Sequence, residues 1–176
     1  MKPLITGIAL IIIILIMIIF QTDNYNYRLQ SDFLKLCADE ASNSALLFYD
    51  EDKFRGGQKI FNEAEGIKII EYVIKSYLKT DGALLPLKES YWKDRISYTA
   101  YFFNDNLICG VYKNGIKINS FSFLYPYLYT DDELLYKKSV AEATVIVTIN
   151  AGRKKYRLIF LSGPVTIRSS GYEYDI

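Results

Sequence analysis

The hydrophobic pattern begins with one unbroken apolar run close to the start of the chain. Residues 4–20 carry no charge and include nine isoleucines. As an α-helix rising ~1.5 Å per residue, the run covers roughly 26 Å, just enough to span the ~30 Å hydrocarbon core of a bilayer. No second run of this kind follows in residues 21–176. The pattern therefore predicts a transmembrane anchor over residues 1–20 and a single domain over residues 21–176.

Beyond the anchor, apolar residues recur at helical spacing. No proline or glycine interrupts residues 8–55, so we expect the anchor helix to continue to about residue 49, with or without a bend near residues 23–26. Asn62 and Glu65 resemble a capping box and predict a second helix over residues 63–79. The apolar stripe of the first helix consists of Leu29, Phe33, Cys37, Ala41, Ala45 and Phe48.

From residue 96 the apolar period changes to that of strands. Asn114-Gly115 is suited to a type I′ hairpin turn, and Ala151-Gly152 marks a second predicted turn. We expect an α+β fold with a long N-terminal helix, transmembrane then amphipathic, a second helix and an antiparallel sheet of about five strands. The predicted strands cover residues 96–103, 107–113, 116–123, 144–150 and 154–161, with a short edge strand within residues 165–176.

The charges around the anchor predict its orientation. Lys2 precedes the apolar run, whereas no cation follows it before Arg28. The positive-inside rule then places the N-terminus in the cytoplasm and the domain outside, as a single-pass protein of the cytoplasmic membrane. Because no small-residue cleavage site follows the run, we expect an uncleaved signal anchor, the alternative being a signal peptide cut at an unusual site.

Composition argues against several functions. Acidic and basic residues nearly balance, which disfavours nucleic acid as a partner. Histidine, the commonest general base and metal ligand, is absent. Ser76 and Lys79 match an S-x-x-K string without the companion motifs of serine acyl-enzymes, and the acidic clusters at residues 50–52 and 131–133 lack calcium-loop spacing. We therefore expect a protein that is not an enzyme and has no cofactor or metal.

Cysteines and aromatic residues supply the remaining candidates. Cys37 and Cys109 could form a disulfide outside the membrane, or could each be a small buried hydrophobe. Residues 121–129 form an aromatic stretch in which Pro126 argues against a central strand. Its side chains either pack on the domain or contact a partner protein. The candidate contacts are Tyr125, Tyr127 and Tyr129, together with Trp92 in the linker that follows Pro86.

A near-terminal apolar helix running into an amphipathic helix and then an antiparallel sheet resembles type IV pilins and TadE-like pseudopilins. The alanines of residues 38–45 are similar to the alanine-rich helix of TadE-like proteins. The resemblance implies peptidase cleavage after Gly7, although the fifth residue beyond it is Ile12 where prepilins carry glutamate. It also implies a structural subunit whose helix lies in lipid and later packs against other subunits.

Small residues favour close packing of helices within a bilayer, and here they lie near the cytoplasmic end. The predicted packing residues are Gly7 and Ala9, followed by Ile12 and Ile16. Two functions follow. The first is a pilin-like or accessory structural subunit of an envelope-spanning assembly, with membrane lipid and other subunits, including copies of itself, as partners. The alternative is a bitopic binding or sensing subunit that contacts a partner protein through its aromatic loop.

Overall fold

A computed structural model describes residues 2–131, 135–157 and 162–174. A long helix, α1, runs through Lys2–Leu46 and is followed by a one-turn helix, α2, at Glu51–Arg55 and by α3 at Glu63–Leu78. Seven strands follow: β1 Ser97–Phe103, β2 Ile108–Lys113, β3 Ile116–Ser122, β4 Tyr127–Asp131, β5 Tyr136–Val140, β6 Thr144–Lys155 and β7 Ser162–Glu173. The chain therefore has the α+β composition that its sequence predicts.

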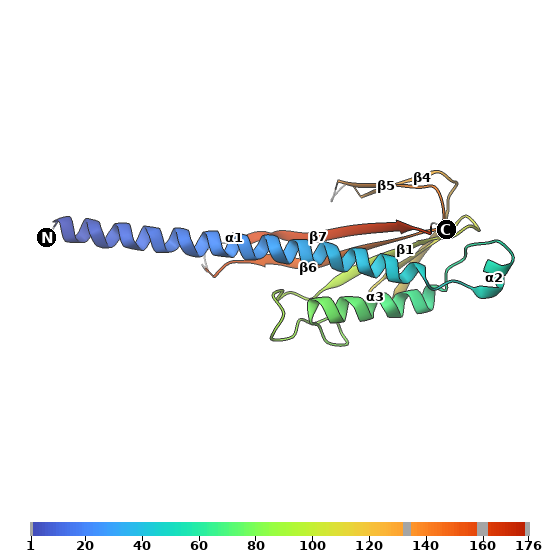
Figure 1. The fold of residues 1–176 in the computed structure, drawn as a ribbon, viewed down its shortest axis with the longest axis horizontal. Helices are drawn as coiled ribbons and strands as arrows, with labels where there is room; N and C mark the ends of the chain where they lie inside the picture. Colours follow the sequence, from blue (N-terminus) through green and yellow to red (C-terminus); the bar gives the residue numbers. More distant parts are fainter. Residues whose placement is uncertain (1, 132–134, 158–161, 175–176) are drawn as a thin grey trace.

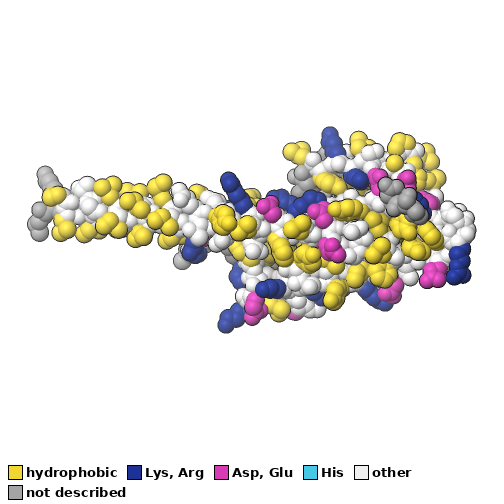
Figure 2. All heavy atoms as spheres, viewed as in Figure 1, with side chains coloured by type: hydrophobic (Ala, Val, Ile, Leu, Met, Phe, Trp, Pro, Cys, Tyr) yellow, Lys and Arg dark blue, Asp and Glu magenta, His cyan; other side chains and the backbone are white. Residues whose placement is uncertain are grey.

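Helix α1 is one continuous element with two environments. Its first half projects from the body of the molecule as an apolar rod, and its second half lies along β6 and β7 (Figures 1 and 2). The projecting half is long and apolar enough to cross a membrane, and nothing in the described chain covers it. No break separates the halves at residues 23–26, because the sequence there contains no helix-breaking residue.

Helix α3 begins and ends close to its predicted limits. The Asn62 side chain accepts a hydrogen bond from the Glu65 backbone N–H at 3.3 Å, which satisfies one free donor of the first turn. Lys79 follows in the left-handed conformation, with φ of 53°, and its backbone N–H donates to the Lys75 carbonyl. The apolar face of α3 is buried, with Ile67, Ile70, Val73, Ile74 and Leu78 all in the core.

The main sheet is antiparallel with strand order β3-β2-β1-β6-β7. Alternate residues of β1 point to opposite faces: Ala100 and Phe102 pack toward α1 and α3, and Phe103 packs toward the β4–β5 hairpin. The molecule therefore has three layers, with two helices, a sheet and a hairpin in that order. Asn114 and Gly115 both have positive φ, as the predicted type I′ turn requires.

Three predictions about the last third of the sequence are wrong. Strand β6 does not turn at Ala151-Gly152 but continues to Lys155, with Gly152 in a bulge at φ +79°. Two residues of the strand predicted over residues 154–161 belong to the end of β6, and its last four lie outside the described residues. The strand that follows is β7, which is longer than the short edge strand predicted within residues 165–176 and includes Gly163 and Pro164. Proline is accommodated there because β7 lies at the sheet edge. The connection after β3, expected to be a loop, forms the β4–β5 hairpin.

Gly66 allows α3 to approach the other layers. A Cβ at this position would lie 2.8 Å from the Phe102 ring and 3.8 Å from the Ala45 Cβ. Phe102 is fully buried, and its ring contacts those of Phe61 and Tyr112, so it has no free space to move into. The contact of α3 with β1 therefore depends on the absence of a side chain here.

We predict that Gly66→Ala lowers the stability of the folded chain. Overpacking costs about 1–3 kcal/mol and alanine regains about 1 kcal/mol of helix propensity, so we expect a net loss of up to about 2 kcal/mol. A thermal melt of the full chain in detergent micelles measures it. Gly82→Ala, where a Cβ meets nothing within 4 Å, is the matched control. An equal midpoint for both variants would contradict this account of the packing.

Candidate functional site

A row of polar residues on α1 attaches the helix to the β6–β7 hairpin. The residues are spaced four apart, so they form one continuous ridge along the helix surface. Each makes a hydrogen bond to a residue near the end of β6 or in β7. The pairs of this seam are Asp23 with Arg157, Tyr27 with Thr166, Ser31 with Arg168, Lys35 with the Ser169 carbonyl, and Asp39 with Ser170.

The first pair of the seam combines charge with burial. Asp23 is only 7% exposed, and its carboxylate accepts from the Arg157 backbone N–H at 2.9 Å and from Nε at 2.6 Å. The Arg157 side chain is 59% exposed, so solvent weakens the pair on that side. The two hydrogen bonds still satisfy a buried carboxylate that would otherwise lack partners, and they fix the end of β6 to the helix.

Lys154 lies beside this pair and is almost fully buried. Its ammonium group lies 4.4 Å from the centre of the Tyr27 ring and 4.2 Å from that of Tyr156, and it donates to the Asn24 side chain. Two aromatic faces and an amide oxygen replace the water that the cation loses on burial. Tyr156 in turn stacks on Phe20, the last residue of the apolar run, with ring centres 5.7 Å apart.

The seam explains the angle at which the hairpin crosses the helix. Rows of residues four apart incline by about 26° to a helix axis, so a hairpin that follows such a row crosses the helix obliquely. Hydrogen bonds at successive helical turns also prevent α1 from rotating relative to the sheet. The arrangement couples the projecting half of α1 to the domain as one rigid body.

The predicted apolar stripe of α1 is only partly correct. Cys37, Ala41 and Ala45 are fully buried against the sheet and α3, but Leu29 and Phe33 are 48% and 40% exposed. The buried face turns instead through Ser31 and Leu34. Phe48, which follows the end of α1, is also outside the core at 37% exposed. Leu29 and Phe33 remain outside it because the sheet covers a different side of the helix there.

These two residues belong to an exposed apolar face on α1. Tyr25, Leu29, Phe33 and Leu36 lie on it at intervals of three or four residues, and Leu36 is 56% exposed. Phe33 stacks on Tyr77 of α3 at 5.3 Å, which extends the face onto the second helix. We call this set the outer face of α1. The same side of the helix also carries charge, because exposed Asp32 and Glu40 lie one turn before and one turn after Leu36.

The predicted packing residues all lie on the projecting rod. Ala9, Ile12 and Ile16 are exposed, and a Cβ at Gly7 would meet nothing within 4 Å. The domain therefore places no demand on these positions. Their role in contacts with other helices stays a prediction.

The predicted partner-contact residues pack inside the domain. Trp92 is 2% exposed in the core beneath the helices, and Tyr129 is buried between the sheet and the β4–β5 hairpin. Tyr125 and Tyr127 are half-buried, and each contacts the Phe123 ring edge-on. The alternative considered for this stretch, packing on its own domain, is what the structure shows.

The two cysteines are free and do not form the disulfide that was considered. Cys37 lies between α1 and the sheet, whereas Cys109 lies on the opposite side among residues of the β4–β5 layer. The sheet separates them, which rules out a bond. Burial raises the pKa of each thiol to about 12, so both stay protonated at neutral pH. The reading of both as small buried hydrophobes is confirmed.

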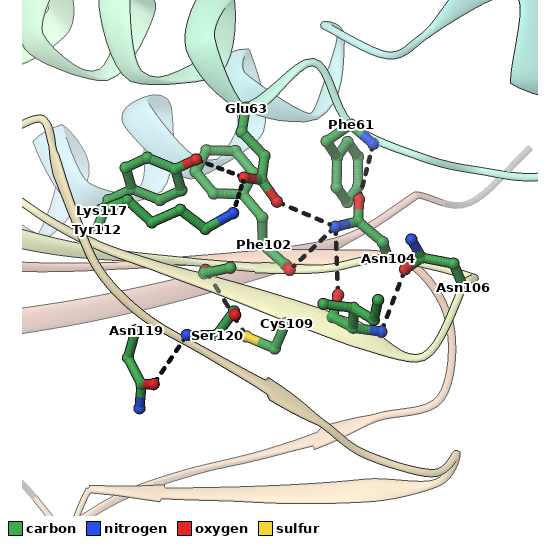
Figure 3. A network of polar contacts seen from close by, with 12 residues as sticks. Phe61, Glu63, Phe102, Asn104, Asn106, Cys109, Tyr112, Lys117, Asn119 and Ser120 are labelled. Carbon is green, nitrogen blue, oxygen red and sulfur yellow. Dashed lines mark hydrogen bonds and ion pairs between the residues drawn. The ribbon is translucent and has the colours of Figure 1, made fainter.

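A second polar cluster, at the opposite end of the sheet, surrounds Glu63 (Figure 3). Its carboxylate accepts hydrogen bonds from Tyr112 at 2.5 Å, Lys117 at 3.0 Å and Asn104 at 3.3 Å. Gly110 provides the room, since a Cβ there would lie 2.5 Å from a Glu63 oxygen. Burial, and then the bond to Glu63, raises the pKa of Tyr112, and the bond to Glu63 raises that of Lys117. The cluster joins the start of α3 to β2 and β3.

The cavity that contains the S-x-x-K residues does not assemble catalytic groups. A cavity of about 430 Å³ between α1, α3 and residues 89–92 has both Ser76 and Lys79 in its wall, but no general base pairs with the serine there among the described contacts. In the acidic cluster at 50–52, Asp50 caps α2 instead; the other cluster lies partly outside the described residues. Within the described residues, no group of three or more acidic or cysteine side chains could hold a metal.

Comparison of the chain with protein-family models, with curated proteins and with solved structures finds no match. The geometry of the chain therefore carries the functional argument alone.

Sequence reasoning missed the seam, although its spacing is present in the sequence. A polar residue on an amphipathic helix ordinarily faces solvent, so Tyr27, Ser31 and Asp39 gave no individual signal. Their regular interval of four, beginning at Asp23 just past the apolar run, is the signal that marks a docked polar ridge.

We predict that Asp23→Ala destabilises the full chain. It removes two hydrogen bonds to a buried carboxylate and leaves Arg157 without its partner, which should cost about 1–2 kcal/mol because Arg157 is partly solvated. The thermal midpoint in detergent micelles is the measurement. Asp32→Ala, an exposed aspartate on the same helix, should leave it unchanged. If both variants melt alike, the seam does not contribute to folding.

Proposed function

We propose that this chain is a non-enzymatic, membrane-anchored structural subunit of pilin-like type, which assembles with other subunits through α1. The observation that carries the proposal is the outer face of α1. It combines an apolar rod, uncovered by the described chain, with a further apolar surface on the same helix beside the domain.

Lipid accounts for the rod but not for the outer face. Leu29 follows Phe20 by nine residues and Leu36 by sixteen, which places them about 13 Å and 24 Å further along the helix. The headgroup layer is only about 5–7 Å thick on each side of the hydrocarbon core. From Leu29 onward the outer face therefore lies in water when α1 spans the membrane, where a protein surface rather than lipid would cover its apolar side chains.

A second copy of the chain fits this requirement. Each copy offers the same apolar rod followed by the exposed apolar side chains of the outer face, so that α1 of one subunit packs against α1 of the next both inside and beyond the bilayer. The rigid seam supports this use because the domain then follows the position of its helix. Within the membrane, association depends on close packing rather than on hydrophobicity, which makes Gly7, Ala9, Ile12 and Ile16 the residues to test.

The alternative, a binding or sensing subunit that uses its aromatic loop, has less support. The tyrosines of that loop pack into the apolar cluster between the sheet and the β4–β5 hairpin. Its exposed leucines are Leu124 and Leu128. These two positions supply the variants that distinguish the functions.

We predict that Ile16→Trp and Leu36→Glu each abolish self-association. The first introduces bulk into the rod and the second introduces charge into the outer face, and neither changes a contact within the folded domain. Chemical cross-linking of the full chain in membranes should show loss of oligomers, while the thermal midpoint shifts by an amount equivalent to less than about 0.5 kcal/mol. Leu124→Glu is the matched control. Loss of cross-linked products in the Leu124→Glu variant alone would favour the binding subunit.

We propose further that the domain lies outside the cytoplasmic membrane, as Lys2 before the anchor suggests. A cysteine introduced at the exposed Gln58 should react with a membrane-impermeant maleimide in intact cells. Cys37 and Cys109 give no background because both are buried thiols. Labelling of Gln58→Cys only after lysis would place the domain in the cytoplasm.

A further inference from the structure

The residues at the end of β6 lie beside the last residues of the apolar run on α1. Arg157 Nη2 lies 3.5 Å from the carbonyl oxygen of Ile19, a residue within the run. The Tyr156 ring stacks on Phe20. If α1 spans a bilayer, these contacts hold the tip of a strand at the boundary between hydrocarbon and headgroups. No extended stalk then separates the domain from the membrane.

The side chains at this height are of the kinds that phospholipid headgroups attract. Residues 153–157 contain four cations in five positions, whereas the whole chain is almost neutral. Lys154 is caged by tyrosines, but Arg153 is exposed and more than half of the Arg157 side chain remains accessible. On α1, Tyr25 is 63% exposed and Arg28 is exposed one turn later. Figure 2 shows Lys and Arg side chains on both sides of the rod where it enters the body.

The positions of the arginines along α1 and β6, and the length of their side chains, agree with binding to lipid phosphate groups. Arg28 lies about 12 Å beyond Phe20 along the helix, and Arg153 lies about 13 Å along the strand from Arg157, so both backbones lie above the headgroup layer and only their side chains extend back to it. Long cationic side chains extend toward an interface while their stems cover apolar surface. Tyrosine rings favour the same layer because they have an apolar body and a polar end.

We propose that this surface binds the phosphate groups of the phospholipids that surround α1, with a preference for anionic lipid. It rests on the membrane anchoring in the proposed function but not on self-association. We call it the headgroup collar, and it consists of Phe20, Tyr25, Arg28, Arg153, Tyr156 and Arg157. The collar positions the domain directly on the membrane and holds the outer face of α1 at a fixed height above the bilayer before any partner binds.

The first test measures the distance of β6 from the lipid. The full chain is placed in nanodiscs of phosphatidylcholine that contain a nitroxide-labelled headgroup, and backbone amide signals are recorded. We expect the Lys154 amide to lose at least about half of its intensity and the Gln58 amide, at the far end of the molecule beside α2, to keep its intensity (Figure 1). Equal attenuation at both positions would overturn the proposal.

The second test measures lipid preference. The thermal midpoint of the full chain is compared in nanodiscs of phosphatidylcholine alone and of a 7:3 mixture with phosphatidylglycerol. Since each cation near an anionic surface contributes to binding, we expect a midpoint about 3 °C higher in the mixture, and loss of the difference in 0.5 M salt. Inorganic phosphate added to neutral discs should not reproduce the rise. A response to free phosphate, or no response to anionic lipid, would overturn the proposal.

Charge-reversal variants connect the effect to the collar. Arg28→Glu combined with Arg153→Glu should remove the lipid-dependent rise, whereas Arg55→Glu on the distant α2 should retain it. Leu36→Glu should also retain it, even though the proposed function predicts that this variant no longer self-associates. A Leu36→Glu chain that loses both properties would show that the lipid response is a consequence of assembly, and would contradict the collar.

Discussion

Docking of the second half of α1 on the β6–β7 hairpin is the interaction on which the rest of the structure depends. The buried face of the helix is made of small and medium residues, so the apolar contact there is modest in area for each turn. The polar ridge beside it fixes the position of α1 along β6 and β7 and its rotation about its own axis. Small apolar side chains alone do not fix either. Asp23 begins that ridge three residues after the apolar run, so the domain holds the helix almost from the end of that run onward.

The two halves of this one helix need different surroundings. Residues 4–20 need an apolar environment along their whole circumference, whereas the following residues need a core on one side and water or a partner on the other. A flexible joint would separate these requirements. The continuous helix instead transmits the position of the rod to the domain, and the outer face of α1 carries exposed apolar side chains beyond the end of the rod. A structural subunit that packs through its helix needs both properties.

Local signals in the sequence predicted the elements whose determinants are local. The asparagine cap of α3, the Asn114-Gly115 turn and the absence of helix breakers in α1 depend on neighbouring residues, and those elements are found within one to three residues of their predicted limits. The course of β6 depends on distant residues. Gly152 continues the strand because its bulge is held by Asn150 and because Asp94 accepts from the Arg153 N–H. Without those contacts in view, Ala151-Gly152 resembles an ordinary turn.

The candidate surfaces show the same division. Burial of the aromatic segment was considered from its composition, but the side toward which it packs depends on the β4–β5 hairpin, which periodicity did not predict. The seam and the outer face could not be separated from sequence, because both consist of residues at helical spacing. Their separation depends on which side of α1 the twisted sheet covers, and that is a property of the whole fold.

Cysteine reactivity at position 36 tests most directly whether a protein surface covers the outer face of α1 when the chain is anchored in a membrane. The rate at which Leu36→Cys reacts with a membrane-impermeant maleimide would be compared between native membranes and the detergent-dispersed chain, with Gln58→Cys as the reference. The account predicts that Leu36→Cys reacts much more slowly in membranes while Gln58→Cys reacts at the same rate in both. Equal rates at residue 36 would show that the outer face is uncovered and would contradict assembly through α1.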